Sequence, residues 1–217
     1  MTEHGELIYG LTVAVDIENF SKLDTLDQYA AQSALGEVLD TASGRAGLDR
    51  ETWYRQVRGD GELAVLPADT DVAWVVARLP HELGGVLSEL RTAGSWPRLR
   101  LRLAMHHGTL TRGRFGPVGQ APIVVSRLLD ARAVRRALAG TADRDLVLVV
   151  SSTLFHEVVK TRFYGMDPTL FASFRVTAKG ATYLAHVTTE PVFSHSMGPL
   201  GEEPPPTSLN NRLLETT

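Results

Sequence analysis

Two apolar runs that each stop at an aspartate constrain this chain more than any other feature of its sequence. Residues 7–15 form a mostly apolar run of strand length, and Asp16 follows directly. Residues 59–61 read Gly-Asp-Gly between two strand-like runs, a strong signal for a tight β-hairpin with Asp60 at its tip. Two strand-end carboxylates brought side by side are suitable ligands for hard divalent cations such as Mg²⁺. Together the two segments suggest two-metal chemistry on a triphosphate.

The composition is that of one globular domain without covalent cross-links. The chain has 217 residues, 43% of them hydrophobic, so it can bury a sizeable core without disulfides. It contains no cysteine, which excludes thiolate zinc sites, and no apolar run approaches the length of a membrane span. The formal net charge of −3 argues against binding along a nucleic-acid backbone. Because residues 1–6 lack the basic-then-apolar order of a secretory signal, we expect a cytoplasmic protein.

Hydrophobic periodicity predicts elements in the order β-α-β-β-α-β, with further strands and helices added. This order predicts an α+β fold with a ferredoxin-like core, in which the first strand lies beside the hairpin. Asp16 and Asp60 would then be neighbours, and Ser21 would cap the first helix, with Asp24 in its first turn. The predicted strands are residues 7–15, 52–57, 62–66, 99–106, 145–150, 170–177 and 182–188. One predicted helix begins at about residue 21, and three others span residues 71–90, 121–138 and 152–159.

Glycine and proline set the expected boundaries. Gly108 is expected to end the strand at residues 99–106, and residues 112–119 to form a glycine-rich connection. We expect one domain over residues 1–189. Residues 190–217 carry several prolines and no core pattern, so they are predicted to form a flexible C-terminal tail.

Three segments, taken in order, resemble the catalytic domain of class III nucleotidyl (adenylate and guanylate) cyclases. They are Asp-Ile-x-x-Phe-Ser at residues 16–21, Gly-Asp-Gly at residues 59–61, and residues 119–127 followed by Leu128-Leu129. Either aspartate motif alone would be weak, but the two in this order, with the later arginine, are fairly specific. The resemblance covers roughly residues 8–188.

This resemblance implies a reaction and a set of site residues. Two Mg²⁺ or Mn²⁺ ions per site would be held by Asp16, Asp60 and the backbone carbonyl of Ile17. They would activate the ribose 3′-hydroxyl for attack on the α-phosphorus of a nucleoside triphosphate, giving a cyclic nucleotide and pyrophosphate. Arg127 matches the arginine that stabilises the transition state. Lys179 resembles a triphosphate-binding lysine.

The resemblance further implies how the substrate is held and how the chains assemble. Gln56 and Gly59 fall at substrate-binding positions ahead of the second aspartate. Sites of the family form between two catalytic domains, so a single-domain chain would act as a homodimer.

The departures from the family pattern concern the sugar and the base. Ile123 stands where the family has a ribose-positioning asparagine, and its side chain cannot form hydrogen bonds. Gln56 stands where adenylate cyclases have lysine and guanylate cyclases have glutamate, and its partner position falls near Gly116. The sequence therefore has neither the lysine that selects adenine nor the glutamate that selects guanine at position 56. Because an amide both donates and accepts, Gln56 could read a pyrimidine. Divergent relatives make cyclic pyrimidine nucleotides in antiviral defence, and the resemblance permits that role.

Several site residues also have a plain structural interpretation, which the sequence leaves open. Asp16 could be a helix N-cap and Asp60 an ordinary turn residue. Arg127 could lie on a solvated helix face or pair with Asp130. Gln56 could be a strand residue without a ligand.

The remaining polar residues favour structural roles. Lys179 is typical of a surface turn. His106 and His107 are adjacent in a strand and must point to opposite faces, so packing is favoured over metal binding. Five arginines near the fourth predicted strand are typical of a solvated face, although they could also bind phosphate; they are Arg98, Arg100, Arg102, Arg112 and Arg114.

Two functions of different class therefore follow from the sequence. The first is a metal-dependent nucleotidyl cyclase that acts as a homodimer and binds neither nucleic acid nor membrane. The second is a catalytically degenerate cyclase-fold protein that binds nucleotide as a regulatory or scaffold module. The isoleucine at position 123 supports the second, whereas retention of both aspartates argues against it. A phosphate-binding protein unrelated to cyclases is a distant third.

Overall fold

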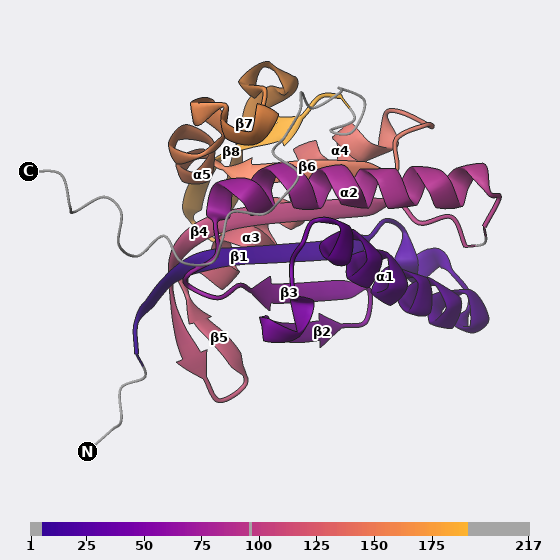
Figure 1. The fold of residues 1–217 in the computed structure, drawn as a ribbon, viewed down its shortest axis with the longest axis horizontal. Helices are drawn as coiled ribbons and strands as arrows, with labels where there is room; N and C mark the ends of the chain where they lie inside the picture. Colours follow the sequence, from indigo (N-terminus) through magenta and orange to yellow (C-terminus); the bar gives the residue numbers. More distant parts are fainter. Residues whose placement is uncertain (1–5, 96, 191–217) are drawn as a thin grey trace, which may run out of the picture.

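A single mixed β-sheet forms the centre of the protein in the computed structural model, which describes residues 6–95 and 97–190. These residues form an eight-stranded sheet in the order β2-β3-β1-β4-β6-β8-β7, with β5 paired to β4 (Figure 1). The α+β, ferredoxin-like class predicted from the sequence is confirmed. The strands are β1 (Ile8–Ile17), β2 (Tyr54–Arg58), β3 (Gly61–Val65), β4 (Leu101–Gly113), β5 (Gly116–Gly119), β6 (Leu146–Ser151), β7 (Phe171–Ala178) and β8 (Ala181–Thr188).

Helices cover both faces of the sheet, so the central strands are buried on two sides. One face packs against α1 and α2, and the other against α3 and α4 (Figure 1). Alternation along β1 divides its side chains between the two cores: Val13 and Val15 face α1 and α2, whereas Ala14 faces α3. The helices are α1 (Thr25–Arg45), α2 (Val72–Thr92), α3 (Gln120–Leu129), α4 (Arg132–Ala139) and α5 (Ser152–Glu157).

The first helix begins later than its predicted cap. Ser21 lies in a short 3₁₀ turn, and Asp24 is the residue whose carboxylate accepts the backbone N–H of Asp27, at 2.9 Å. Asp24, and not Ser21, is the N-cap because its backbone is extended, as an N-cap requires. An aspartate at this position also complements the helix dipole. By contrast α2 follows the prediction, with Asp71 as its N-cap.

The third quarter of the chain differs most from the prediction. β4 does not end at Gly108 but continues to Gly113, and the glycine-rich connection is a hairpin in which β5 pairs back onto β4. The predicted helix over residues 121–138 is two helices, because Ala131 between them is extended. The hydrophobic period runs through this break, so the pattern alone could not reveal it.

The last elements close the sheet as expected. Ser151 caps α5 by accepting the N–H of Leu154, and β7 and β8 form the predicted hairpin. Buried Arg144 holds the end of the domain, donating to the carbonyls of Thr188 and Glu190 at 2.7 and 3.0 Å. The predicted tail, residues 190–217, lies outside the described residues except for Glu190. Within the described ranges, no helix has the length and apolar character that crossing a membrane requires.

The position of β1 between β3 and β4 brings the two predicted site segments together. Asp16 pairs with Gly61 in the β1–β3 register, and the N–H of Ile17 donates to the carbonyl of Asp60 at 2.8 Å. Gly61 is needed for this approach, because a Cβ there would overlap the Val15 carbonyl oxygen. Gly59 has open space around it, and neither glycine has a positive φ. The second glycine of the motif thus serves strand packing, not the turn.

Substitution of the two hairpin glycines should therefore have unequal effects. Gly61→Ala must push β3 away from β1, and we expect a loss of about 2 kcal/mol or more of unfolding free energy. Gly59→Ala meets no atom within 4 Å and serves as the matched control, with a change of at most about 0.5 kcal/mol. Urea denaturation of both variants measures the difference. Equal stability of the two would show that the close approach is not required.

Candidate functional site

Asp16 and Asp60 line one small cavity at the end of β1. The cavity has a volume of about 110 Å³ and is also lined by Arg58, Ser126 and Asp130. Asp16 is only 8% exposed, whereas Asp60 lies at the exposed tip of the β2–β3 hairpin. β1 supplies the first carboxylate, the hairpin the second, and α3 the opposite wall. The expected juxtaposition of the two aspartates is present.

Asp16 is paired with Arg102, one of the five arginines that the sequence assigned to a solvated face. Arg102 of β4 donates to both carboxylate oxygens, from Nε at 2.7 Å and from Nη2 at 2.8 Å. Burial raises the pKa of Asp16 to about 6, Arg102 opposes this rise, and the charges of Asp60 and Asp130 add to it. The register that pairs Asp16 with Arg102 across β1 and β4 creates this contact. Neither residue is the helix N-cap or solvated arginine that the sequence also allowed.

The neighbouring arginines are likewise paired rather than solvated. Arg98 binds the buried carboxylate of Asp145 at 2.7 Å, and Arg100 binds Glu18 at 2.7 Å. Arg112 and Arg114 do lie exposed, on the β4–β5 hairpin, as a solvated face predicts. The sequence missed the pairing because each acidic partner comes from a distant segment of the chain.

The donors at the cavity suit a divalent cation in type. Carboxylate oxygens, such as those of Asp16 and Asp60, are ligands that Mg²⁺ or Mn²⁺ accepts, whereas Ile17, the predicted carbonyl ligand, does not line this cavity. Burial raises the pKa of Asp16, and the charges of Asp60 and Asp130 raise it further; a bound cation would stabilise the ionised carboxylate against both effects. No cluster of three or more His, Cys, Asp or Glu side chains arranged for a metal occurs in residues 6–95 and 97–190. A cation here would complete its shell with oxygens from substrate or water.

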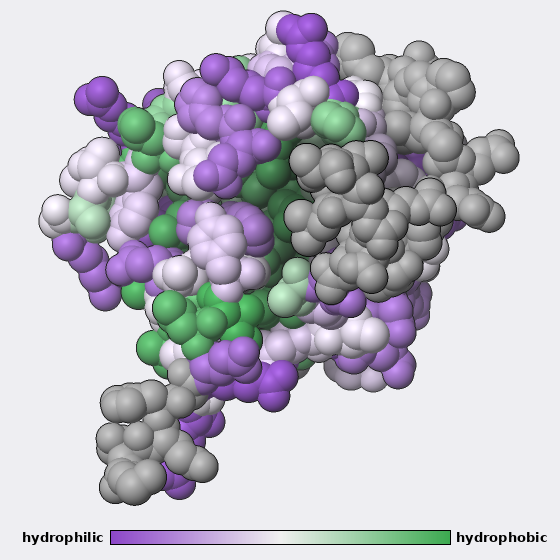
Figure 2. Space-filling model, turned by 60° about the vertical axis from the view of Figure 1, so that its left-hand side comes forward, coloured by the Kyte–Doolittle hydropathy of each residue, from purple (hydrophilic) through white to green (hydrophobic). Residues whose placement is uncertain are grey.

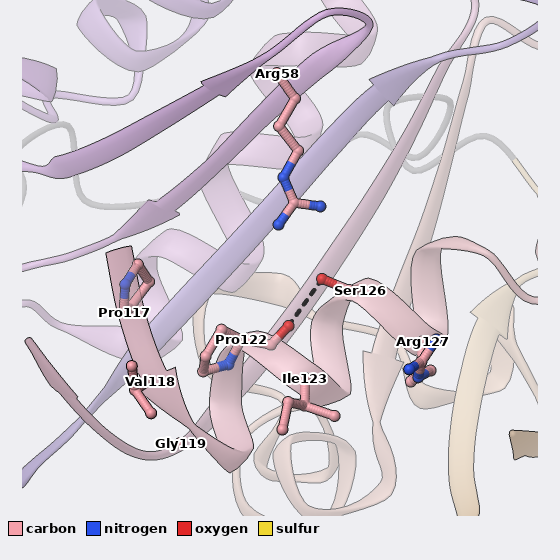
Figure 3. A pocket seen from close by; sticks show the side chains of 8 residues that line it. All are labelled: Arg58, Pro117, Val118, Gly119, Pro122, Ile123, Ser126 and Arg127. Carbon is pink, nitrogen blue, oxygen red and sulfur yellow. Dashed lines mark hydrogen bonds between the residues drawn. The ribbon is translucent and has the colours of Figure 1, made fainter. Parts of the chain in front are cut away.

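A second cavity, of about 380 Å³, lies between β2, β5 and α3. Arg127 and Ile123 of α3 line it, opposite Arg58 at the end of β2. In Figure 3 the Arg58 side chain extends toward α3, where the Ser126 hydroxyl donates to the Pro122 carbonyl at 2.8 Å. Arg58 and Ser126 line both cavities, so the two adjoin. Asp130 pairs with Arg135, not with Arg127.

Gln56 is held by the β4–β5 hairpin. Its amide Nε2 donates to the carbonyl of Phe115 at 3.1 Å. A Cβ at Gly116 would lie 3.0 to 3.2 Å from the amide atoms of Gln56, so the side chain rests against that glycine. The two positions that the resemblance paired as base readers are therefore in contact.

The other predicted substrate residues are placed differently. Lys179 lies at the exposed tip of the β7–β8 hairpin, at the opposite edge of the sheet from β2, and lines neither cavity. One chain does not bring it to the aspartates. Gly59 is adjacent to Asp60, and its carbonyl accepts the Gln32 amide at 2.5 Å.

The two adjacent histidines pack in the sheet, as expected. His106 Nδ1 lies 2.7 Å from Ser151 Oγ, and burial lowers the pKa of His106 to about 4. His107 instead stacks edge-on against Tyr9. A strand directs the two rings to opposite faces, so they do not form a common site.

The similarity of this chain to known proteins lies in its structure and not in its sequence. No protein-family profile and no curated protein matches the sequence. Solved structures do match. The adenylate/guanylate cyclase/hydrolase from Silicibacter pomeroyi superimposes with a TM-score of 0.60 at 18% identity, covering 85% of this chain and 98% of that one. The guanylyl cyclase Cya2 gives 0.58 at 16% identity, covering 85% and 93%.

The chain has the class III cyclase fold. A third cyclase structure, the guanylate cyclase domain of RhGC from Catenaria anguillulae in complex with GTP, gives a TM-score of 0.51 at 18% identity, covering 86% of this chain and 99% of that domain. The cyclase fold thus extends over most of the described residues. The resemblance stated from the three sequence motifs is confirmed as a fold.

Proposed function

We propose that this protein is a metal-dependent nucleotidyl cyclase, which converts a nucleoside triphosphate to a 3′,5′-cyclic nucleotide and pyrophosphate for second-messenger signalling. The observation that carries the proposal is the contact of the two aspartate segments at one cavity within a cyclase fold. A fold alone would not support an activity, because one fold hosts many functions. The two carboxylates support the activity.

Each site residue has a role in this proposal. Asp16, Asp60 and the Ile17 carbonyl would hold two Mg²⁺ or Mn²⁺ ions, which supply activation of the ribose 3′-hydroxyl and neutralisation of the triphosphate. Arg127 would stabilise charge that develops on the α-phosphate, where an aimed cation is most effective. Arg102 neutralises Asp16 in the absence of a cation and would be released from it when the carboxylate binds one.

The base is proposed to be a pyrimidine. Gln56 uses one amide hydrogen on the Phe115 carbonyl and keeps its oxygen and second hydrogen for a ligand. This neutral, two-sided group lacks the charge that lysine or glutamate would present to a purine. A cyclic pyrimidine nucleotide in antiviral defence is the cellular role that we propose with it.

A homodimer would complete the site. Arg127 and the aspartates line different cavities, and Lys179 lies at the far edge of the sheet. Exposed apolar side chains offer a contact surface: Val118, 57% exposed, lines the larger cavity, and Phe115, 88% exposed, lies in the turn of the β4–β5 hairpin. Hydrophobic side chains also gather in a patch on the face that Figure 2 presents. Such patches mark interaction surfaces.

Two observations favour a second candidate, a cyclase-fold protein that binds nucleotide without turning it over. Ile123 is 45% exposed at the wall of the larger cavity and offers no hydrogen bond to a ribose. Arg102 also occupies both oxygens of Asp16, so a cation must compete with it. Both candidates predict nucleotide binding. Only the first predicts pyrophosphate and a cyclic product.

A binding experiment tests the carboxylates. With Mn²⁺ and each of the four ribonucleoside triphosphates, we expect a rise in melting temperature, because a ligand of the native state stabilises it by mass action. Asp60→Asn should abolish the rise, whereas Asp69→Asn, a matched exposed aspartate on the loop after β3, should keep it. Asp16 is less suitable, since its removal leaves Arg102 buried without a partner. Equal shifts in both variants would place the site elsewhere.

Mixing inactive chains tests the dimer. If metal ligands and Arg127 act from different protomers, Asp60→Asn and Arg127→Ala chains should each be inactive alone and recover up to about a quarter of wild-type pyrophosphate release when mixed and reassociated. One of the two sites in each heterodimer then carries neither substitution. Sedimentation equilibrium provides the control for assembly. A protein that stays monomeric at all assay concentrations contradicts this arrangement.

Substitution at Gln56 tests the base assignment. We expect the wild type to prefer UTP or CTP, and Gln56→Lys and Gln56→Glu to change the relative rates among the four triphosphates by about tenfold, since an unpaired buried polar group costs about 1–3 kcal/mol. Tyr54→Phe, on the same strand face two residues earlier, is the control. Unchanged relative rates in both Gln56 variants would mean that Gln56 is an ordinary strand residue.

A further inference from the structure

Arg58 occupies the junction of the two cavities. It is the last residue of β2 and is followed by Gly59 and the metal-site candidate Asp60. Its side chain lines the small cavity that holds Asp16 and Asp60, and also the larger cavity that holds Arg127. A molecule extending from the carboxylates into the larger cavity would pass Arg58.

Arg58 is an exposed cation beside the carboxylates of the small cavity, and it is not bound to any of them. Within the part of the chain that the structure describes, no ion pair or hydrogen bond involves its guanidinium. The buried or half-buried arginines nearby, Arg50 and Arg102, are each held by carboxylates. A guanidinium that lines a cavity and forms no direct ion pair is available to an anionic ligand, and its planar fork matches phosphate.

Arg58 is the cationic side chain that lines both cavities. Ile123 has no polar atom in its side chain, and the Ser126 hydroxyl donates to the Pro122 carbonyl. Pro117 and Val118 of β5 complete an apolar side, and Figure 3 shows Arg58 extending across from β2 toward α3. The wall therefore combines apolar surface with the guanidinium of Arg58, which adjoins the carboxylates of the same protomer, whereas Arg127 lines the larger cavity alone. This combination fits a ligand with an anionic and an apolar part.

We propose that Arg58 binds the phosphate chain of a triphosphate held at Asp16 and Asp60 of the same protomer. The assignment rests on the proposed function, because the carboxylates fix where the phosphates lie. The phosphates, rather than the base, are chosen because Arg58 adjoins the cavity of the carboxylates, whereas Gln56 is turned toward the β4–β5 hairpin. Arg58 would thereby supply, from β2, a polar contact at the wall where Ile123 supplies none.

Binding of inorganic tripolyphosphate separates this role from base recognition. Titration calorimetry in Mn²⁺ would compare tripolyphosphate with α,β-methylene-UTP and α,β-methylene-ATP, none of which can cyclise. For Arg58→Ala we expect roughly tenfold or greater weakening for tripolyphosphate and for the tighter-binding nucleotide, since hydrogen bonds to charged groups are strong. Arg58→Lys should recover part of the affinity. Arg55→Ala removes an exposed arginine from the opposite face of β2 and should change nothing.

Each other outcome overturns the assignment in a different way. If Arg58→Ala binds both ligand types as tightly as the wild type while Asp60→Asn binds neither, this inference is wrong and the proposed function stands. If Arg58→Ala weakens the nucleotides but not tripolyphosphate, Arg58 contacts the sugar or base instead. If it dissociates a ligand-free dimer in sedimentation, Arg58 is an interface residue. Failure of the wild type to bind any of the probes overturns both proposals.

Discussion

The close contact between Gly61 and the backbone of β1 is the constraint on which the candidate site depends. It allows the Ile17 N–H to reach the Asp60 carbonyl at 2.8 Å and fixes Asp16 opposite Gly61. Side chains alternate along a strand, so a shift of one residue would turn Asp16 toward α1 and α2. The apolar residues on either side of Asp16 prevent this shift, because they would lose their places in the two cores. Packing of the sheet thus positions the carboxylates.

Buried charge is the second constraint at this end of the sheet. Asp16 and Arg102 are 8% and 9% exposed, and their two parallel hydrogen bonds offset only part of the cost of burying the Asp16 carboxylate, whose pKa remains raised. A buried ion pair is often no more stabilising than apolar residues of similar volume. Stability therefore does not by itself explain a carboxylate at this position. Its place at a cavity beside a second carboxylate is better explained by chemistry that uses it.

The fold and the proposed activity depend on different residues. The cyclase structures compared here share 16% to 18% identity with this chain, and a core tolerates such divergence when apolar pattern and volume are kept. Ile123 and Arg58 lie instead on cavity walls, where replacing a side chain changes what can be bound without disturbing the core, and Gln56 rests against the β4–β5 hairpin. The assignment of substrate and mechanism must therefore be argued from these walls.

The sequence by itself determined the fold class, the order of most elements and the adjacency of Asp16 and Asp60, but it did not reveal strand β5. These follow from short-range signals, namely apolar periodicity and a glycine-flanked aspartate, which act within a few residues. It misplaced the cap of α1, and it could not reveal the break before α4 because the apolar period continues through it.

Only the tertiary structure decided which charges are paired and which cavities adjoin. Arg102 and Asp16 are separated by 86 residues, and Gln56 and Phe115 by 59. Such contacts depend on strand register, and register is set by the summed packing of whole strands. No local pattern carries that information. The sequence therefore predicted a solvated Arg102 and gave no role to Arg58.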